Sequence, residues 1–249
     1  MTASHGAYGR RLLTAIAFFA FALATWPVLI SAVPTGASVQ FVSQTTANAS
    51  TPGNRTDAGG TINTILLSAT QQDSNWKGYV GNISGKLTLD DATGKTIYDW
   101  TLTGVTLSGK VFATRNASVS FTGVSCVTTP TVAAEDAFDN LTTTASDSIN
   151  STFSRTVHKQ FFVGNQSITN STCRAIATYV NDTNQSVSES SLFQEVLLQD
   201  PGANLIYTTI IEPHRVGYNS QDYDFQMIVG ESSVKAIPTT FYFFAEISS

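Results

Sequence analysis

The sequence predicts a mainly β protein: an antiparallel β-sandwich with a short helical insertion between its two cysteines. About ten short runs of β-forming residues, separated by turn residues, follow one another after residue 61. One stretch between Cys126 and Cys173 instead places apolar residues at helical spacing. The apolar share of 42% is too high for a disordered chain.

Residues 1–37 are expected to be a secretory signal peptide or a retained signal-anchor. Arg10 and Arg11 precede the apolar run Leu12–Trp26, and small residues follow that run. This order of charged, apolar and small residues is typical of a secretory signal. Cleavage after Ala32 or Ala37 would suit it.

A retained anchor stays open as the alternative at the same place. Extended to Val33, the apolar run covers 22 residues, long enough to cross a bilayer. The positive-inside rule would then keep the two arginines in the cytoplasm. Both interpretations place the rest of the chain outside the cell. We expect contact with the membrane only through this N-terminal segment, and only if it is not cleaved.

Residues 38–60 are expected to be a flexible segment, because most of it is rich in Ser, Thr, Asn and Gly. Near its start, Val39, Phe41 and Val42 form a short apolar strand outside the main domain. A detached apolar strand on a flexible tether can add to an exposed sheet edge of a neighbouring subunit. We therefore expect these three residues to be an assembly strand.

Residues 61–249 are expected to form a single β-sandwich domain. In the run Tyr79–Asp90, Leu87 and Leu89 share one face, while the sequon asparagine Asn82 lies on the polar face. The other expected strands are Thr61–Ala69, Thr96–Leu102, Val105–Thr114, Ala117–Val124, Gln160–Val163, Arg174–Val180, Leu192–Leu198, Leu205–Ile211, Phe225–Val229 and Thr240–Ile247. The last strand is apolar on both faces, so it lies centrally in the sandwich or is covered by a neighbouring subunit.

The helical insertion is predicted from five apolar residues that recur at spacings of three or four. They are Phe138, Leu141, Ala145, Ile149 and Phe153. This is one stripe of an amphipathic helix. Three consecutive threonines at 142–144 weaken helix propensity, so two short helices are the alternative.

The cysteine pair predicts one disulfide between Cys126 and Cys173. An isolated pair in an oxidising compartment forms a bridge, and closing this 47-residue loop stabilises the fold by about 4 kcal/mol in the chain-entropy model. A metal site would need more ligands, since only His158 and His214 follow the signal and no CxxC occurs. We expect no metal and no cofactor.

Ten of the fourteen asparagines stand in the glycosylation triplet Asn-x-Ser/Thr, where chance would place roughly three or four. The ten are Asn48, Asn54, Asn82, Asn116, Asn140, Asn150, Asn165, Asn170, Asn181 and Asn184. N-glycans are attached after a chain crosses a membrane, so this density predicts a heavily glycosylated extracellular protein. The alternative is that a surface rich in Ser and Thr generates such triplets passively.

Composition and motifs argue against nucleic-acid binding and against an enzyme. Without Arg10 and Arg11, the 13 basic residues fall to 11 against 18 acidic ones, a net charge of −7, which does not favour nucleic acid. No nucleophile elbow is present, and neither histidine lies in a recognisable catalytic context.

Two further kinds of binding site were weighed. The pairs Asp90/Asp91 and Asp222/Asp224 offer ligands for calcium, but aspartate is also common in turns. Trp76 and Trp100 could form a sugar platform, but they are more simply core or cross-strand residues.

The run Trp76–Gly85, followed by Leu89–Trp100 with its Asp-Asp-x-x-Gly turn, resembles a motif of a loose group of archaeal secreted, N-glycosylated surface and filament proteins. The runs Leu192–Asp200, Asp224–Val229 and Phe241–Ile247 are similar to that group too, so the resemblance covers most of the mature chain. It implies an archaeal envelope or exported filament protein. The group supplies no catalytic residues to carry over.

The sequence thus predicts a non-enzymatic extracellular structural glycoprotein, the repeating subunit of a cell-surface filament or coat. We expect a homopolymer that assembles by β-strand donation and carries N-glycans. A monomeric surface-anchored binding module or adhesin is the alternative. Ten potential sugars restrict subunit contacts chiefly to the segment before Asn48 and the stretch after Asn184.

Overall fold

The computed structural model describes residues 33–102 and 107–248. Strands make up 33% of these described residues and helices 7%, and the sheets are antiparallel, which confirms the predicted mainly β fold. The predicted signal or anchor lies outside the described residues except for its last five. Within the described part, no helix is both long and apolar enough to span a bilayer.

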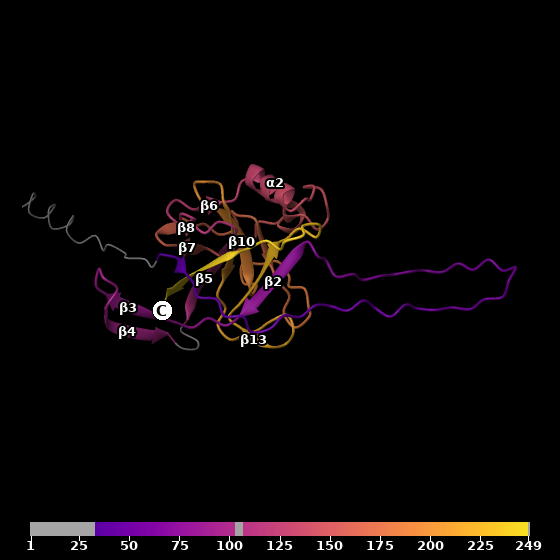
Figure 1. Ribbon diagram of the computed structural model, residues 1–249, viewed down its shortest axis with the longest axis horizontal. Helices are drawn as coiled ribbons and strands as arrows, with labels where there is room; N and C mark the ends of the chain where they lie inside the picture. The colour runs from indigo at the N-terminus through magenta and orange to yellow at the C-terminus, as the bar shows by residue number, and fades with distance from the viewer. Residues whose placement is uncertain (1–32, 103–106, 249) are drawn as a thin grey trace, which may run out of the picture. The chain divides into compact units, whose positions relative to one another are not determined.

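The strands and helices follow one another along the chain as labelled in Figure 1. They are β1 (Thr35–Gly36), β2 (Trp76–Gly81), β3 (Gly85–Asp90), β4 (Thr96–Leu102), β5 (Ser108–Thr114), β6 (Ser125–Cys126), α2 (Thr129–Phe138), α3 (Ile149–Thr152), β7 (Phe161–Val163), β8 (Gln166–Ile168), β9 (Ala175–Ala177), β10 (Gln194–Gln199), β11 (Leu205–Ile210), β12 (Arg215–Val216), β13 (Asp222–Tyr223), β14 (Phe225–Gly230) and β15 (Tyr242–Ser248).

The main sheet has the order β1-β15-β5-β11-β10-β6, and β9 also pairs with β10. Its central strands β5, β10 and β11 are buried almost throughout. Because side chains alternate across a strand, neighbours such as Phe112 and Ala113 face opposite sides of the sheet. The sheet therefore has an apolar layer on each face.

One face of the main sheet packs against irregular chain and the β7–β8 hairpin. Phe112, Leu198 and Ile206 on the sheet share a buried cluster with Phe121 and Val163. Residues 117–124, which were predicted to form a strand, make no regular pairing, so that prediction was wrong. Phe121 and Val124 are nevertheless buried there, which explains the apolar pattern that suggested a strand.

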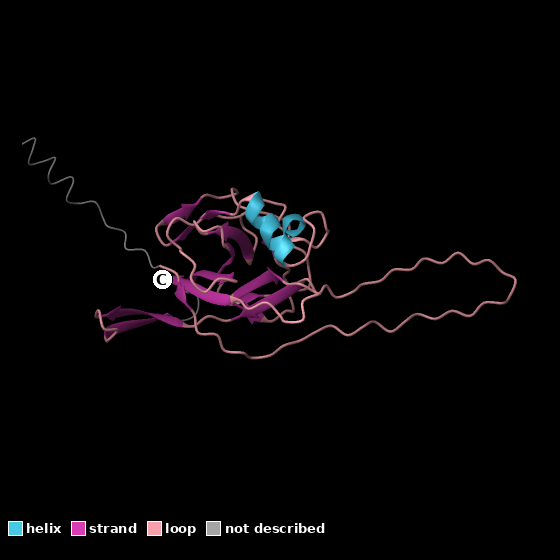
Figure 2. Cartoon of the chain, turned by 45° about the horizontal axis from the view of Figure 1, so that its top comes forward, coloured by secondary structure: helices cyan, strands magenta, loops and turns pink. Residues whose placement is uncertain are grey.

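The opposite face packs against the β14–β2 sheet and the helices. Leu197 and Tyr207 on the main sheet share a second cluster with Met227 of β14 and with Ile149 and Phe153. Figure 2 shows the two helices lying close together. Two layers of sheet around a shared core give the expected sandwich.

The helical insertion does lie between the cysteines, but its position differs from the prediction. Helix α2 ends at Phe138, where the predicted stripe begins, and residues 139–148 form turns before α3. Asn140 has φ of 60°, which ends the helix. The Asp136 carboxylate then accepts a hydrogen bond from the Ile149 amide at 2.7 Å, so a side chain spans the gap between two short helices.

The predicted strand Tyr79–Asp90 is two strands in two sheets. β2 pairs with β14, whereas β3 pairs with β4 in a separate hairpin. Between them, the Ile83 amide donates to the buried Asp224 carboxylate at 2.8 Å. This hydrogen bond replaces a strand partner and allows the chain to change sheets without leaving a buried amide unpaired.

Residues 37–75 form a long loop between β1 and β2. It contains the two predicted strands Ser38–Val42 and Thr61–Ala69, and neither is formed. Figures 1 and 2 show the loop as two extended runs leading away from the sheets and back. Within the described residues, one hydrogen bond joins the two runs, from the Ala47 amide to Gln72 Oε1 at 2.8 Å.

Candidate assembly surfaces

The predicted disulfide is present. Cys126 and Cys173 are bonded, with their Cα atoms 4.9 Å apart. Cys126 belongs to β6, and Cys173 lies two residues before β9, so the bridge joins the two segments that share one edge of β10. It closes the loop that contains both helices and the β7–β8 hairpin.

His158 organises the chain around that bridge. Its ring is fully buried; Nδ1 lies 2.9 Å from the Lys159 carbonyl oxygen, and Nε2 accepts from the Cys173 amide at 2.9 Å. This pattern requires a neutral ring with the proton on Nδ1. Burial also lowers the pKa of His158. The contacts give this histidine a structural role beside the bridge.

The N-terminal segment begins by pairing with the main sheet. Thr35 pairs with Ala245 and Gly36 with Phe244, and the Ala37 amide donates to the Phe243 carbonyl at 3.0 Å. Cleavage after Ala37 would remove these bonds, whereas cleavage after Ala32 would keep them. The structure therefore makes the earlier of the two expected cleavage points the less disruptive one.

The predicted assembly strand follows directly and is exposed. Val39 is 67% exposed, Phe41 74% and Val42 88%. They belong to no strand. Apolar residues this exposed form neither a core nor a sheet layer, so they are available for contact with another molecule.

A second exposed apolar segment lies further along the same loop. We call residues Thr61–Ala69 the arm. Ile62 is fully exposed, Leu66 is 95% exposed and Leu67 83%. The sequence pattern placed this strand inside the sandwich, so its exposure was missed; only the tertiary structure separates a strand that has a partner from one that has none.

Two sheet edges lie close to one another. β2 is paired on one side only, with β14, and β15 pairs on its outer side with the two residues of β1. Tyr79 of β2 packs edge-on against Phe243 of β15, with ring centroids 5.0 Å apart. The two edges therefore border the same side of the sandwich.

The doubly apolar strand β15 finds cover on both faces within the chain. Phe243 contacts Tyr79 in one layer, and Phe244 packs against Phe121 in the other at 5.2 Å between centroids. A position inside the sandwich accounts for the apolar pattern, so β15 does not by itself indicate a subunit interface.

Most of the sequon asparagines are exposed. Those whose side chains lie open to solvent are Asn48, Asn54, Asn82, Asn140, Asn165, Asn170, Asn181 and Asn184, whereas Asn116 and Asn150 are half-buried. Asn116 Oδ1 accepts from the Ser118 amide at 2.9 Å. Asn150 Nδ2 donates to the Thr143 carbonyl at 3.0 Å, within the turns that link the helices.

We predict that Asn150 carries no glycan in the folded protein. Its amide nitrogen is the atom a sugar would occupy, and it is engaged and half-buried, whereas the Asn82 side chain is exposed. Site-by-site glycopeptide mass spectrometry should find Asn82 and Asn140 modified and Asn150 unmodified. Equal occupancy at Asn82 and Asn150 would contradict this expectation.

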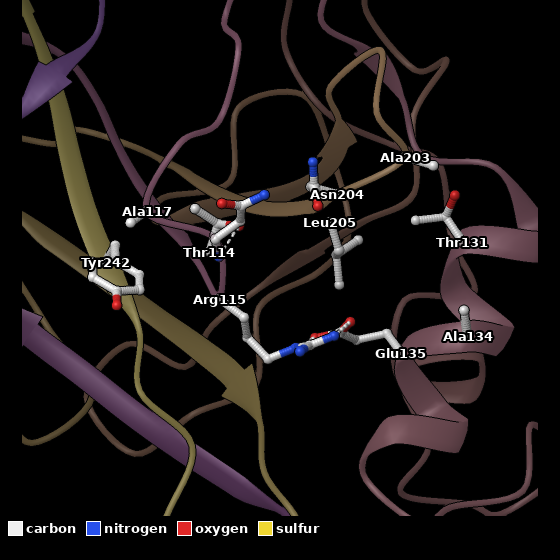
Figure 3. Close-up of a pocket in the computed structure, with 11 residues that line it drawn as sticks. Thr114, Arg115, Ala117, Thr131, Ala134, Glu135, Ala203, Asn204, Leu205 and Tyr242 are labelled. Carbon is white, nitrogen blue, oxygen red and sulfur yellow. Dashed lines mark hydrogen bonds and ion pairs between the residues drawn. The ribbon is translucent and has the colours of Figure 1, made fainter.

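One polar cavity of about 380 Å³ lies between the end of β5, α2, the β10–β11 turn and the start of β15. Figure 3 shows Arg115 and Glu135 meeting across it, with Nε–Oε1 and Nη2–Oε2 distances of 2.6 and 2.7 Å. Its lining includes the sequon asparagine Asn116 and the half-exposed Tyr242. The cavity offers hydrogen bonds and an aromatic ring, but no nucleophile paired with a base.

A buried acidic group lies next to this cavity. Asp139 is 2% exposed, and neither carboxylate oxygen has a hydrogen-bond partner; Lys235 Nζ lies 3.7 Å from Oδ1. Burial and the neighbouring Glu135 raise the pKa of Asp139 to about 6. Two cationic groups lie over the Phe138 ring: Arg115 Cζ is 3.5 Å and Lys235 Nζ 3.1 Å from the ring centroid.

The aspartate pairs considered for calcium have other partners. Asp91 Oδ1 accepts from the amides of Thr93 and Lys95 and so closes the β3–β4 turn. Asp224 accepts from the amides of Ile83 and His214. Among residues 33–102 and 107–248, no three His, Cys, Asp or Glu side chains gather as a metal site would require.

The two tryptophans, for which core or cross-strand positions were expected rather than a sugar platform, lie apart in the fold. Trp76 is half-buried, packs against Phe153 and donates from Nε1 to the Asp147 carbonyl at 2.7 Å. Trp100 lies in the β3–β4 hairpin, 51% exposed, with its ring against Tyr98 at 5.0 Å. The two indoles thus belong to different sheets.

Comparison with known proteins identifies no relative. No family model matches the chain. No curated protein and no solved structure matches it either. The proposed function therefore rests on the geometry of the chain's own residues.

Proposed function

We propose that this chain is a non-enzymatic, N-glycosylated structural protein of the cell exterior, the repeating subunit of a filament or coat. Subunits join by β-strand donation. The observation that carries the proposal is the combination of exposed apolar segments of strand type with a sheet edge that is open at β2 and only partly covered, by β1, at β15.

The exposure is the first support. Val39, Phe41 and Val42 are each two-thirds exposed or more, and burying one such side chain stabilises by about 1.5–3 kcal/mol. Contiguous exposed apolar surface on a soluble protein marks an interaction site. When this segment pairs with an edge strand of a neighbouring copy, its apolar side chains become buried. The backbone groups of both strands are hydrogen-bonded at the same time.

The acceptor edge is the second support. β15 has seven residues, but β1 covers only a short part of its outer side. A longer strand from a neighbouring copy that displaces β1 would bond along more of that edge. A contact that uses different surfaces on the two copies is heterologous, and repetition of it gives an open filament.

The distribution of sequons is the third support. Glycans at the exposed asparagines would keep neighbouring chains away from most of the domain. β2 and β15 contain no sequon, and neither does the segment from Val33 to Ala47. The surfaces that the proposed assembly uses therefore contain no potential sugar of their own.

A monomeric adhesin is the second candidate, and two observations favour it. The polar cavity at Arg115, Glu135 and Tyr242 has a volume of about 380 Å³, within the range of small-ligand sites, and its polar lining would suit a hydroxyl-rich ligand. Tyr98 and Trp100 also expose an aromatic pair on the β3–β4 hairpin. An adhesin would remain monomeric at concentrations at which a filament subunit polymerises.

Deletion of residues 38–42 tests the proposal. We expect a folded monomer that forms no filaments in negative-stain microscopy, because the donor strand is gone while the sandwich is intact. The matched control deletes the next five residues, 43–47, four of which are polar, and should still polymerise. Filaments that persist without residues 38–42 would show that this strand is not the donor, and a wild-type chain that never polymerises would favour the adhesin.

A further inference from the structure

The arm, Thr61–Ala69, has the composition of a strand but no strand partner. It contains Ile62, Ile65, Leu66 and Leu67 among threonines and small polar residues, a composition that favours β structure. All four apolar side chains are more than half exposed. An extended apolar segment in water leaves both its side chains and its backbone groups without protein partners.

The outer edge of β2 has no strand partner, and β2 is the strand that follows the arm in the sequence. The amides of Glu231 and Asp224 donate to the carbonyls of Asn75 and Gly81, so the odd-numbered positions of β2 face β14. In an antiparallel pair, the alternate positions point the other way. The backbone groups of Gly78 and Val80 therefore point outward, where the described part of the chain supplies no further strand.

The other side of this small sheet is already occupied. The Ile228 amide of β14 donates to Glu195 Oε2 at 2.9 Å, and the Gln226 carbonyl accepts from Thr209 Oγ1 at 2.8 Å. These side chains stand in for a strand on the inner side of β14. A third strand can therefore be added only at β2.

The arm and the β2 edge are chemically compatible. No charged residue occurs from Ala58 to Gln72, and the one charge in β2, Lys77, is paired with Glu231. Val80 is 38% exposed and would contact an added strand, while Gly78 presents no side chain. Neither the arm nor β2 contains a sequon; the nearest one to the β2 edge is Asn82, directly after the last residue of that strand.

The connection between the arm and β2 leads away from the sheet. Asn75, the residue before β2, is held by two hydrogen bonds: Nδ2 donates to Asp147 Oδ2 at 2.6 Å, and Oδ1 accepts from the Ser233 amide at 3.1 Å. Figure 1 shows the chain entering β2 from the loop rather than folding back along the strand. The arm thus does not pair with its own β2 edge, which stays open within the described residues.

We propose that the arm is a second donated strand, which adds to the β2 edge of a neighbouring copy of this chain. The proposal rests on the filament function above and names a further contact of the same assembly. Residues 38–42 add to the β15 edge and the arm to the β2 edge of one neighbour, because the two edges are adjacent through Tyr79 and Phe243. Each copy thereby extends both sheets of the next sandwich.

Two complementary variants test the proposal. The donor-deficient variant replaces Ile62, Ile65, Leu66 and Leu67 with Ser and keeps the loop length. The edge-blocked variant is Gly78→Pro, which removes an outward amide; proline is tolerated on an edge strand, and a Cβ at Gly78 meets only the Met227 carbonyl, at 4.0 Å. Val80→Lys is a second edge-blocked variant in case the proline disturbs folding.

We expect neither kind of variant to form filaments alone. Mixed in equal amounts, they should form a 1:1 complex in size-exclusion chromatography with light scattering, since one supplies the arm and the other the open edge. The matched control replaces Gln44, Thr45, Thr46 and Gln71 in the same loop with Ser or Ala and should polymerise like the wild type.

The outcomes separate the two proposals. Filaments of the donor-deficient variant, with loss of filaments on deletion of residues 38–42, would overturn the arm proposal and leave the filament function standing. A monomeric wild type would overturn both. A donor-deficient variant that is monomeric, less stable than the wild type and unable to complement Gly78→Pro would show that the arm pairs with its own β2 edge.

Discussion

Removal of the disulfide should lower the free energy of unfolding by about 4 kcal/mol, the value that the chain-entropy model gives for a 47-residue loop. The structure explains why the loop matters. It holds α2, α3 and the β7–β8 hairpin, and their residues Ile149, Phe153 and Val163 are buried in both core layers. In an unfolded chain without the bridge, all of these segments gain conformational freedom.

The measurement is urea unfolding of the double variant Cys126→Ala, Cys173→Ala at pH 7. The midpoint should fall by the amount that corresponds to about 4 kcal/mol. Wild-type protein unfolded in the presence of a thiol reductant is the control and should show a similar midpoint. A loss below about 1 kcal/mol would mean that the bridge does not constrain the unfolded chain in the way the model assumes.

Asp139→Asn should stabilise the protein increasingly as the pH rises from 4 to 7. The pKa of Asp139 is raised to about 6 in the folded state by burial and by Glu135, against an ordinary value of 3.8. A carboxyl whose folded pKa is raised binds its proton more tightly in the folded state. Its contribution to stability is complete below the unfolded pKa and is lost as the pH rises through about 6.

A shift of this size corresponds to roughly 3 kcal/mol. Because pH 4 already lies slightly above the unfolded pKa of 3.8, the difference in unfolding free energy between variant and wild type should move by roughly 2–2.5 kcal/mol in favour of the variant from pH 4 to pH 7. Urea midpoints measured in parallel at each pH cancel the contributions of other groups, among them the buried Glu195, whose pKa is also raised. A difference that stays constant with pH would contradict the raised pKa.

The strands that could be predicted from sequence are those whose alternation persists in the fold. β4 matches its predicted bounds, and β5, β10, β11, β14 and β15 lie within a few residues of theirs. The apolar residues of the latter five strands fill the two layers around the main sheet, so pattern and burial coincide there. Ile97, Tyr98 and Trp100 of β4 are instead more than half exposed. The disulfide was predictable because only two cysteines exist.

The residues of the predicted stripe do not form one continuous helix, and the reason is local. Its apolar residues Ile149 and Phe153 are fully buried, but they reach the core from a turn of α3 rather than from one long helix. The positive φ at Asn140 and the hydrogen bond from the Ile149 amide to Asp136 interrupt the helix. A periodic pattern reports burial, and burial alone does not distinguish a helix from a sequence of turns.

The exposed apolar segments were predictable only in part. The segment with Val39, Phe41 and Val42 was singled out because flexible residues separate it from the domain. The arm has an equally apolar pattern but precedes β2 closely, so it was assigned to the sandwich. Nothing in the composition of Thr61–Ala69 records that its backbone lacks a partner.

The sequence by itself determined the β class, the disulfide and the positions of the ten sequons, because each depends on residue identity and local spacing. The tertiary structure alone decided which strands have partners, which sequon side chains are half-buried and which edges remain open. Pairing between strands depends on contacts between residues far apart in the chain, such as Trp76 with Gly230 and Thr35 with Ala245. A local sequence pattern does not indicate which distant segment a strand will pair with.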